Sequence, residues 1–379
     1  MSLPRSLALP LSTAALALTA SAAPNELTNV RWSGESVALD DLRDAADEEA
    51  LAAISEHLAR YDEWMRGTED VVSLSEDLRV ILIAGDERTS KKRMKLVEKT
   101  LEAFDGLMAP PDRSGNDEDF VIAEWGVGDH VPDAQPVVLI EVEDQDRYLS
   151  LVEGIGSQAP HLATWARTAA GLPGFAEEQV HAAAWQSAPD GYELGDVWRP
   201  ENELVNRLAR LLLHRSYGPQ PTWLRVAVAW RVEMEVMDSI YCFPYRAGFV
   251  GIAEHGGWES ELKSAFKRRT DVPVGIDEFA RWERNEWDEE SAQIAWGIVE
   301  YLARHEAEAL PAIAEEFRVR YKAGYRTTHA DGTWTTNPGF QVPMDAQREV
   351  LVAATSEDVL EQATEFFRKG KRYKPKRRR

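Results

Sequence analysis

Apolar residues recur with two different periods along the chain, and the first half favours a sheet. Short runs rich in β-branched residues at 78–84 and 136–142 predict two buried strands. Helical spacing of apolar residues over 92–108 and 145–155 predicts a helix after each strand. Two shorter pieces with strand-like character follow, at 180–185 and 192–197. This order predicts a small sheet that is covered by helices.

The second half is patterned for helices. Six segments after residue 200 have apolar residues at helical spacing: 201–215, 222–237, 259–266, 289–306, 311–323 and 356–367. A stretch rich in Thr, Gly and Trp at 327–343 predicts a loop or hairpin, and an amphipathic segment at 40–66 predicts a helix before the sheet. The chain is therefore expected to be α+β, with a small helix-covered sheet subdomain followed by a mainly helical subdomain.

The two ends of the chain differ from its middle. Arg5 precedes an apolar stretch at 7–18, and Ala20-Ser21-Ala22 provides the small residues that a signal peptidase needs. This pattern predicts a signal peptide over 1–22 and export to a periplasm or the cell exterior, with an uncleaved anchor as the alternative. The remaining boundaries are expected at 23–75 for an N-terminal helical segment, 76–200 for the α/β subdomain, 201–367 for the helical subdomain and 368–379 for a disordered basic tail.

The charge balance narrows the choice of partners. The 379 residues include 65 Asp and Glu against 43 Lys and Arg, which gives a net charge of -22. Such a surface would repel phosphates, so nucleic-acid binding by the folded body is not expected. Nine of the twelve residues from Arg368 to Arg379 are basic, and this tail could contact an anionic surface. A single cysteine, Cys242, excludes an internal disulfide.

The most informative segment is the predicted helix that begins near residue 201. On a helical wheel of about 100° per residue, Asn202 and Asn206 align along the margin of the apolar face. Glu203 points to a different side, next to Arg207 and Arg210. The sequence therefore predicts two stacked amides beside the core and a separate charged arc.

This helix resembles the His-Glu-x-x-His helix of gluzincin zinc metallopeptidases, the peptidase-MA-like proteins among them, with asparagines in place of the histidines. The following helix also resembles the family's Pro-x-Trp-Leu-x-Glu-Gly-x-Ala pattern, since Pro221, Trp223, Leu224 and Ala229 match it. The resemblance covers residues 76–366 and is strongest over 201–233. It implies a zincin-like fold with the cleft beside these two helices.

The resemblance also implies that the metal ligands have been lost. Asn202 and Asn206 stand at the histidine positions and Val226 at the glutamate position, so that only Glu203, at the general-base position, keeps its family identity. Zinc catalysis needs three strong donors and an open position for water. No metal or other cofactor is therefore expected, and the chain is interpreted as an inactive pseudopeptidase that serves as a binding or scaffolding module.

Two alternatives stay open for the carboxylates. Glu203 with Glu233 could activate water in a hydrolase that uses no zinc. In the structural alternative, Glu203 forms an exposed ion pair with Arg207, and Glu233 and Glu235 pair with Arg225 or Arg231.

Other side chains of this region are expected to have structural roles. His214, near the helix end, is expected to be a protonated capping residue. Trp223 and Trp230 are expected to pack beneath the lost metal site. The expected degenerate cleft contains Asn202, Asn206, Val226, Glu233 and Trp223, and its partner is an unknown protein, peptide or envelope polymer.

Overall fold

A computed structural model describes residues 29–44, 48–109, 136–158, 162–189, 198–241, 257–269, 272–281, 286, 288–330, 333–337 and 339–374. Its centre is a seven-stranded mixed sheet in the order β2-β1-β3-β4-β5-β7-β6. The strands are β1 (Asn29–Trp32), β2 (Glu35–Ala38), β3 (Val71–Leu74), β4 (Val80–Ala84), β5 (Val137–Val142), β6 (Gly174–Glu177) and β7 (Ala182–Gln186). A mixed helix-and-sheet class is thus confirmed.

The central strands are those with the clearest sequence signal. β4 and β5 pair in parallel with Val80 beside Val137, and β5 pairs in parallel with β7, with Val138 beside Ala182. β7 was expected within 180–185, whereas the piece expected at 192–197 lies outside the described residues. The antiparallel hairpin β1–β2 and the four-residue strands β3 and β6 were not predicted, because short edge strands carry little periodicity.

Both faces of the sheet are buried. Alternate residues of β4 point to opposite sides: Val80 and Leu82 join one apolar cluster, and Ile81 and Ile83 join the other. The second cluster contains the helices that cover one face, α1 (Glu48–Ala59), α2 (Asp62–Met65), α4 (Gln145–Gln158) and α5 (Leu162–Ala169). The first cluster contains α3 (Glu87–Leu107), α6 (Pro200–Tyr217) and α7 (Thr222–Met237) on the opposite face.

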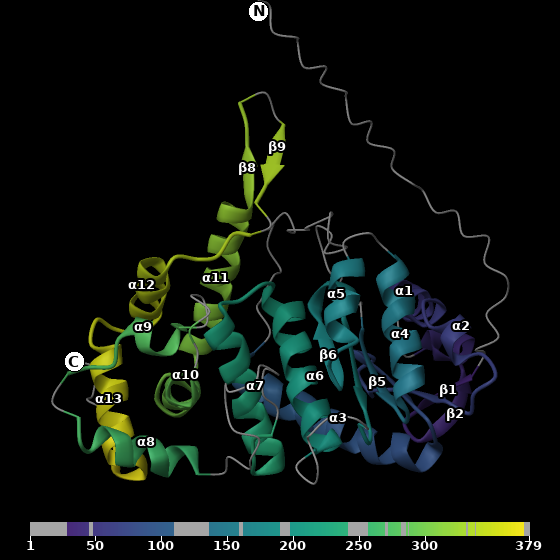
Figure 1. Cartoon of the computed structure of the whole chain (residues 1–379), viewed down its shortest axis with the longest axis horizontal. Helices are drawn as coiled ribbons and strands as arrows, with labels where there is room; N and C mark the ends of the chain where they lie inside the picture. Colours follow the sequence, from purple (N-terminus) through teal and green to yellow (C-terminus); the bar gives the residue numbers. More distant parts are fainter. Residues whose placement is uncertain are drawn as a thin grey trace, which may run out of the picture.

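The helical half continues from α7 and shares its core with the sheet. It contains α8 (Trp258–Phe266), α9 (Ile276–Phe279), α10 (Glu289–His305), α11 (Ala309–Tyr325), α12 (Met344–Ala354) and α13 (Val359–Lys369). Figure 1 shows these helices on one side of α6 and α7 and the sheet on the other. One continuous apolar cluster runs from the strands β4, β5 and β7 through α6 and α7 to α13. The two expected subdomains are therefore packed on a common core.

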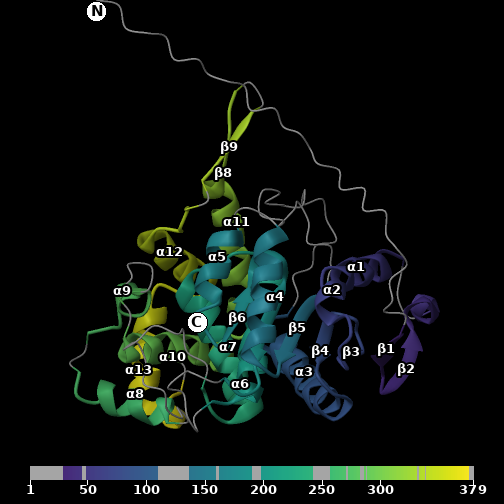
Figure 2. The same ribbon diagram turned by 45° about the vertical axis from the view of Figure 1, so that its right-hand side comes forward.

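Several expected boundaries differ. The helix predicted over 40–66 is divided into a 3-10 turn η1 (Leu39–Asp44), α1 and α2, with buried Tyr61 at the break. The hairpin expected within 327–343 is present as β8 (Arg326–Thr328) and β9 (Trp334–Thr336), which project from the body (Figures 1 and 2).

The start of the expected basic tail is packed against the helical half. Residues 368–374 continue α13 to Lys369, form the turn η6 (Gly370–Arg372) and place Tyr373 against Tyr301, with ring centroids 6.0 Å apart. Residues 375–379 and the expected signal peptide at 1–22 lie outside the described residues. None of the helices in the described ranges is long and apolar enough to cross a membrane.

Candidate functional site

Helix α6 carries the candidate residues and is held on two sides. Pro200 occupies its first turn, where a missing N–H costs nothing, and Gly218 ends it with a φ of 65°. Leu204, Leu208 and Leu211 on one side are buried in the core shared with the sheet and α7. The rest of the helix is also largely buried, so its polar residues must find partners inside the protein.

The two asparagines converge on one carboxylate of α7. Asn202 donates from Nδ2 to Oε1 of Glu233 at 2.7 Å, and Asn206 donates from Nδ2 to Oε2 of the same residue at 3.0 Å. The backbone N–H of Tyr241 also donates to Oε1, at 2.6 Å. The predicted alignment of Asn202 and Asn206 is thus present, and both amides bind the buried Glu233 side chain.

Burial sets the protonation of Glu233. Its side chain is 0% exposed, and loss of hydration raises the pKa of Glu233 to about 8. Its three N–H donors oppose this rise in the pKa, while the nearby carboxylate of Glu203 adds to it. Glu233 was expected to pair with an arginine, and the structure instead directs the amides of Asn202, Asn206 and the Tyr241 backbone at its carboxyl. Of the expected pairs, Arg231 binds Glu235 at 2.7 Å.

Glu203 forms a buried ion pair with the residue one turn later. Oε2 of Glu203 lies 2.5 Å from Nη2 of Arg207, and each residue is only 3% exposed. An exposed pair was expected, and that prediction was wrong because β6 packs over this side of α6. Gly174 of β6 makes the close approach possible, since a Cβ there would lie 2.9 Å from Nη2 of Arg207.

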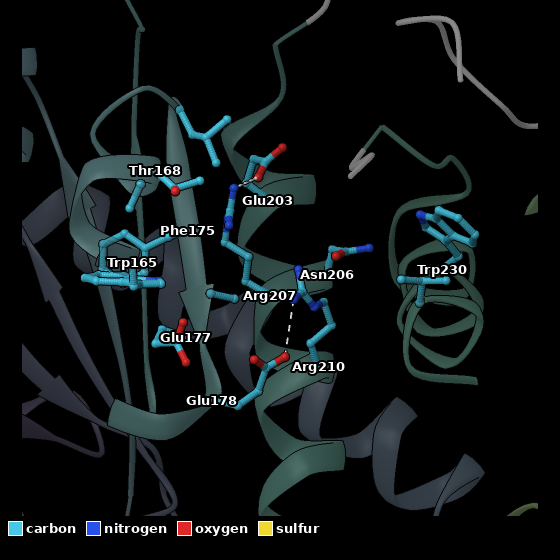
Figure 3. A pocket seen from close by; sticks show the side chains of 15 residues that line it. Trp165, Thr168, Phe175, Glu177, Glu178, Glu203, Asn206, Arg207, Arg210 and Trp230 are labelled. Carbon is cyan, nitrogen blue, oxygen red and sulfur yellow. Dashed lines mark hydrogen bonds and ion pairs between the residues drawn. The ribbon is translucent and has the colours of Figure 1, made fainter. Parts of the chain in front are cut away.

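A pocket of about 330 Å³ lies between the sheet edge and helices α6 and α7. Glu203, Asn206 and Val226 all line it, so three of the sequence-predicted residues meet at one cavity. Figure 3 shows Trp165 and Phe175 on one side and Trp230 on the other, with Glu203 and Arg207 facing each other between them.

Three predicted cleft residues do not line this pocket. Asn202 and Glu233 are not part of the lining: Asn202 is bonded to Glu233, and the side chain of Glu233 is fully enclosed. Trp223 lies elsewhere: it packs on Phe279 with ring centroids 5.0 Å apart and donates from Nε1 to Gln347 at 2.9 Å. The two tryptophans of α7 were expected to pack together beneath one site, but Trp230 lines the pocket and Trp223 does not.

The part of the pocket wall that Glu178 and Arg210 form was not predicted. Glu178 lies in the 3-10 turn η3 (Glu178–Val180). Its Oε1 forms ion pairs with Nη2 of Arg210 at 3.2 Å and with Nη1 of Arg225 at 3.0 Å. Burial acts to raise the pKa of Glu178, but Arg225 and Arg210 outweigh it and lower the pKa to about 2. The charged arc of the helical wheel was the one sequence signal for this wall, because it placed Arg207 and Arg210 together.

His214 lies in the last turn of α6, as expected, but the shift of its pKa opposes the protonated form that was predicted. His214 is half-buried, and its ring lies beside His181 with ring centroids 6.2 Å apart; loss of hydration lowers the pKa of His214, although the carboxylate of Glu178 opposes this shift. His181 is 3% exposed, and burial holds the pKa of His181 well below its ordinary value.

The residues at the expected metal position do not fit zinc. The Nδ2 groups of Asn202 and Asn206 are donors directed at Glu233, and the Val226 side chain has no donor atom. Among the residues the structure describes, no group of three His, Cys, Asp or Glu is arranged to hold a metal ion. The space between α6 and α7 is thus occupied by the carboxyl of Glu233, which is hydrogen-bonded to both asparagines.

The geometry also separates the two carboxylates of the alternative hydrolase. Glu203 lines the pocket and is paired with Arg207, whereas Glu233 is enclosed between α6 and α7 and has no exposed surface. A shared catalytic water would need both carboxylates to face one cleft.

Comparisons with known proteins identify no family for the chain. No protein-family model matches the chain, and no curated protein sequence matches it. The likeness to gluzincins therefore stays a prediction from the residues of α6 and α7.

Proposed function

We propose that the chain is a catalytically inactive, metallopeptidase-like binding module that holds an extended polypeptide in the pocket beside β6. The observation that carries the inactive part of the proposal is the bond of Asn202 and Asn206 to Glu233, with Val226 beside it. A metal cannot bind where its expected ligands are amide N–H donors and an isopropyl group. We also propose export of the protein, on the basis of residues 1–22.

The binding part rests on the edge of the sheet. β6 pairs with β7 on one side and is the last strand of the sheet among the described residues. An edge strand can pair with an added extended segment through its backbone groups. Trp165, Phe175 and Trp230 line the pocket next to this edge and provide an apolar surface for a side chain of such a segment.

A hydrolase with Glu203 and Glu233 is the weaker candidate, because Glu233 does not line the pocket. The two functions are separated by purifying the protein with excess zinc, dialysing it and measuring both bound metal and casein hydrolysis. We expect much less than one zinc per chain and no turnover above the blank. Stoichiometric zinc with chelator-sensitive turnover would refute the proposal, and chelator-insensitive turnover lost in Glu203→Gln would favour the hydrolase.

Polypeptide binding is tested by selection from a random heptapeptide phage library. Thr168 is an exposed residue of α5 that lines the pocket, so Thr168→Trp should occlude it without disturbing the core. Thr164→Trp, one turn earlier and not part of the pocket lining, is the matched control. We expect enriched peptides to bind the wild type and Thr164→Trp alike and to bind Thr168→Trp at least tenfold more weakly. No enrichment, or equal binding to both variants, would refute the site.

A further inference from the structure

A second cavity, of about 280 Å³, lies at the other end of the sheet from β6. It is enclosed by the turn between β1 and β2, the end of β3 and one side of α3. Figure 2 shows α3 passing below β3 and β4, with the β1–β2 hairpin beside them. None of its lining residues is shared with the pocket beside β6.

One end of this cavity is basic. Lys91 and Lys95, one turn apart on α3, line it and are exposed, and neither forms an ion pair with any residue that the structure describes. By contrast, Lys92 of the same helix pairs with Glu201 at 2.6 Å. Arg31 of β1 also lines the cavity, but its guanidinium already has partners, the carbonyl of Gly34 at 2.9 Å and the carboxylate of Glu87 at 3.1 Å. Lys91 and Lys95 are therefore the cations of the cavity lining with which a ligand could pair.

The other end is acidic. Glu98 is seven residues after Lys91 on the same face of α3, about 10 Å along the helix axis at a rise of about 1.5 Å per residue. Its Oε1 accepts the backbone N–H of Glu76 at 3.0 Å, which turns the carboxylate toward β3. Within the described ranges no cation lies at ion-pair distance from Glu98. Burial raises the pKa of Glu98, and the neighbouring carboxylates of Asp77 and Glu76 add to the rise.

The region between the two ends is apolar. Leu74 of β3 is buried, and Met94 of α3 is half-buried; both line the cavity. A ligand would therefore meet cations at one end, an anion at the other and hydrocarbon in between. A simple anion such as phosphate would use only one of these features.

We propose that this cavity binds a small zwitterion whose ammonium and carboxylate groups are separated by several ångströms, such as a dipeptide with free termini. Its carboxylate would lie against Lys91 and Lys95, and its ammonium against Glu98. Two extended residues span about 7 Å, which lies between the axial separations of Glu98 from Lys95, about 4.5 Å, and from Lys91, about 10 Å. Each charged group of the ligand would meet an oppositely charged side chain that has no ion-pair partner among the described residues.

The test is calorimetric titration of the full chain with Ala-Ala, N-acetyl-Ala-Ala and Ala-Ala amide. We expect saturable binding of Ala-Ala and at least tenfold weaker binding of each capped form. Equal binding of the acetylated form would overturn the zwitterion and leave a site for anions only. Absence of binding by Ala-Ala would overturn the proposal altogether.

Variants locate the site. Lys91→Ala combined with Lys95→Ala, and separately Glu98→Gln, should each weaken Ala-Ala binding at least tenfold. Lys99→Ala, on the same helix but outside the cavity lining, is the matched control and should bind as the wild type does. Circular dichroism confirms that each variant is folded. Unchanged binding in the Lys91/Lys95 double variant would overturn the assignment, and Thr168→Trp should leave Ala-Ala binding intact whether or not the pocket beside β6 binds polypeptide.

Discussion

Asn202 of α6 donates its side-chain N–H to the carboxyl of Glu233 on α7 at 2.7 Å, 31 residues further along the chain. With the matching bond from Asn206, this contact fills the space between the two helices with protein groups. Asn202 and Asn206, which the gluzincin resemblance places at the metal-ligand positions, therefore share one carboxyl as their partner.

Restoring the missing donors is the most direct test of the gluzincin resemblance. Because Asn202 and Asn206 reach the two oxygens of one carboxylate, their side-chain ends lie close together, and Val226 lines the same pocket as Asn206. We expect the triple variant Asn202→His, Asn206→His, Val226→Glu to bind one zinc per chain, measured by competition with a chromogenic chelator. The double variant that keeps Val226 is the control and should bind more weakly, since it lacks the third ligand. A folded triple variant without zinc would contradict the site assignment.

Removal of Glu203 should cost more stability than removal of an equivalent exposed residue. Glu203→Ala takes the ion-pair partner from buried Arg207, and breaking a buried pair in this way costs about 3–5 kcal/mol. Glu56→Ala breaks the exposed pair with Arg60, which has the same spacing along its helix and contributes about 0.5 kcal/mol. Urea unfolding of the two variants measures the difference. Equal destabilisation would show that the Glu203 pair is hydrated.

The protonation of Glu233 should make the protein less stable as the pH rises. The pKa of Glu233 is raised to about 8 in the folded state, above its ordinary value of 4.5. Between these values the folded state holds a proton that the unfolded state has lost, so the free energy of unfolding falls with increasing pH. Glu233→Gln should flatten this decline between pH 5 and pH 8, measured by urea unfolding at each pH. A decline of the same slope in the variant would assign it to other groups.

The buried histidines should act in the opposite direction. Burial lowers the pKa of His181 and His214 in the folded state, so below pH 6.5 the unfolded state takes up protons that the folded state does not. Stability is therefore lost as the pH falls from 6.5. His181 has a φ of 51°, which asparagine tolerates, so His181→Asn should reduce the loss between pH 7 and pH 5 without backbone strain. His329→Asn, an exposed position, is the control and should leave the pH dependence unchanged.

Most of the helices and two of the central strands could be predicted because their signals are local, whereas the shorter helices α5, α9 and α12 were not predicted. α7 begins and ends at the predicted residues 222 and 237, and β4 lies within the predicted run 78–84, since periodicity and β-branched runs act over a few residues. The Glu203–Arg207 pair was also predictable from its spacing of four on one helix. Its burial was not, because that depends on β6, which lies nearly thirty residues earlier and packs closely only through Gly174.

The sequence by itself determined the longer helices and the central strands β4 and β5, and which face of α6 carries the two amides. Only the tertiary structure decided that the carboxyl of Glu233 binds Asn202 and Asn206. It also decided that Trp230 lines the pocket while Trp223 does not, and that Glu178 pairs with Arg210. The physical reason is that helix and strand patterns arise from neighbouring residues. Partners that are distant in the chain meet only when burial forces each polar group to find a hydrogen bond inside the core.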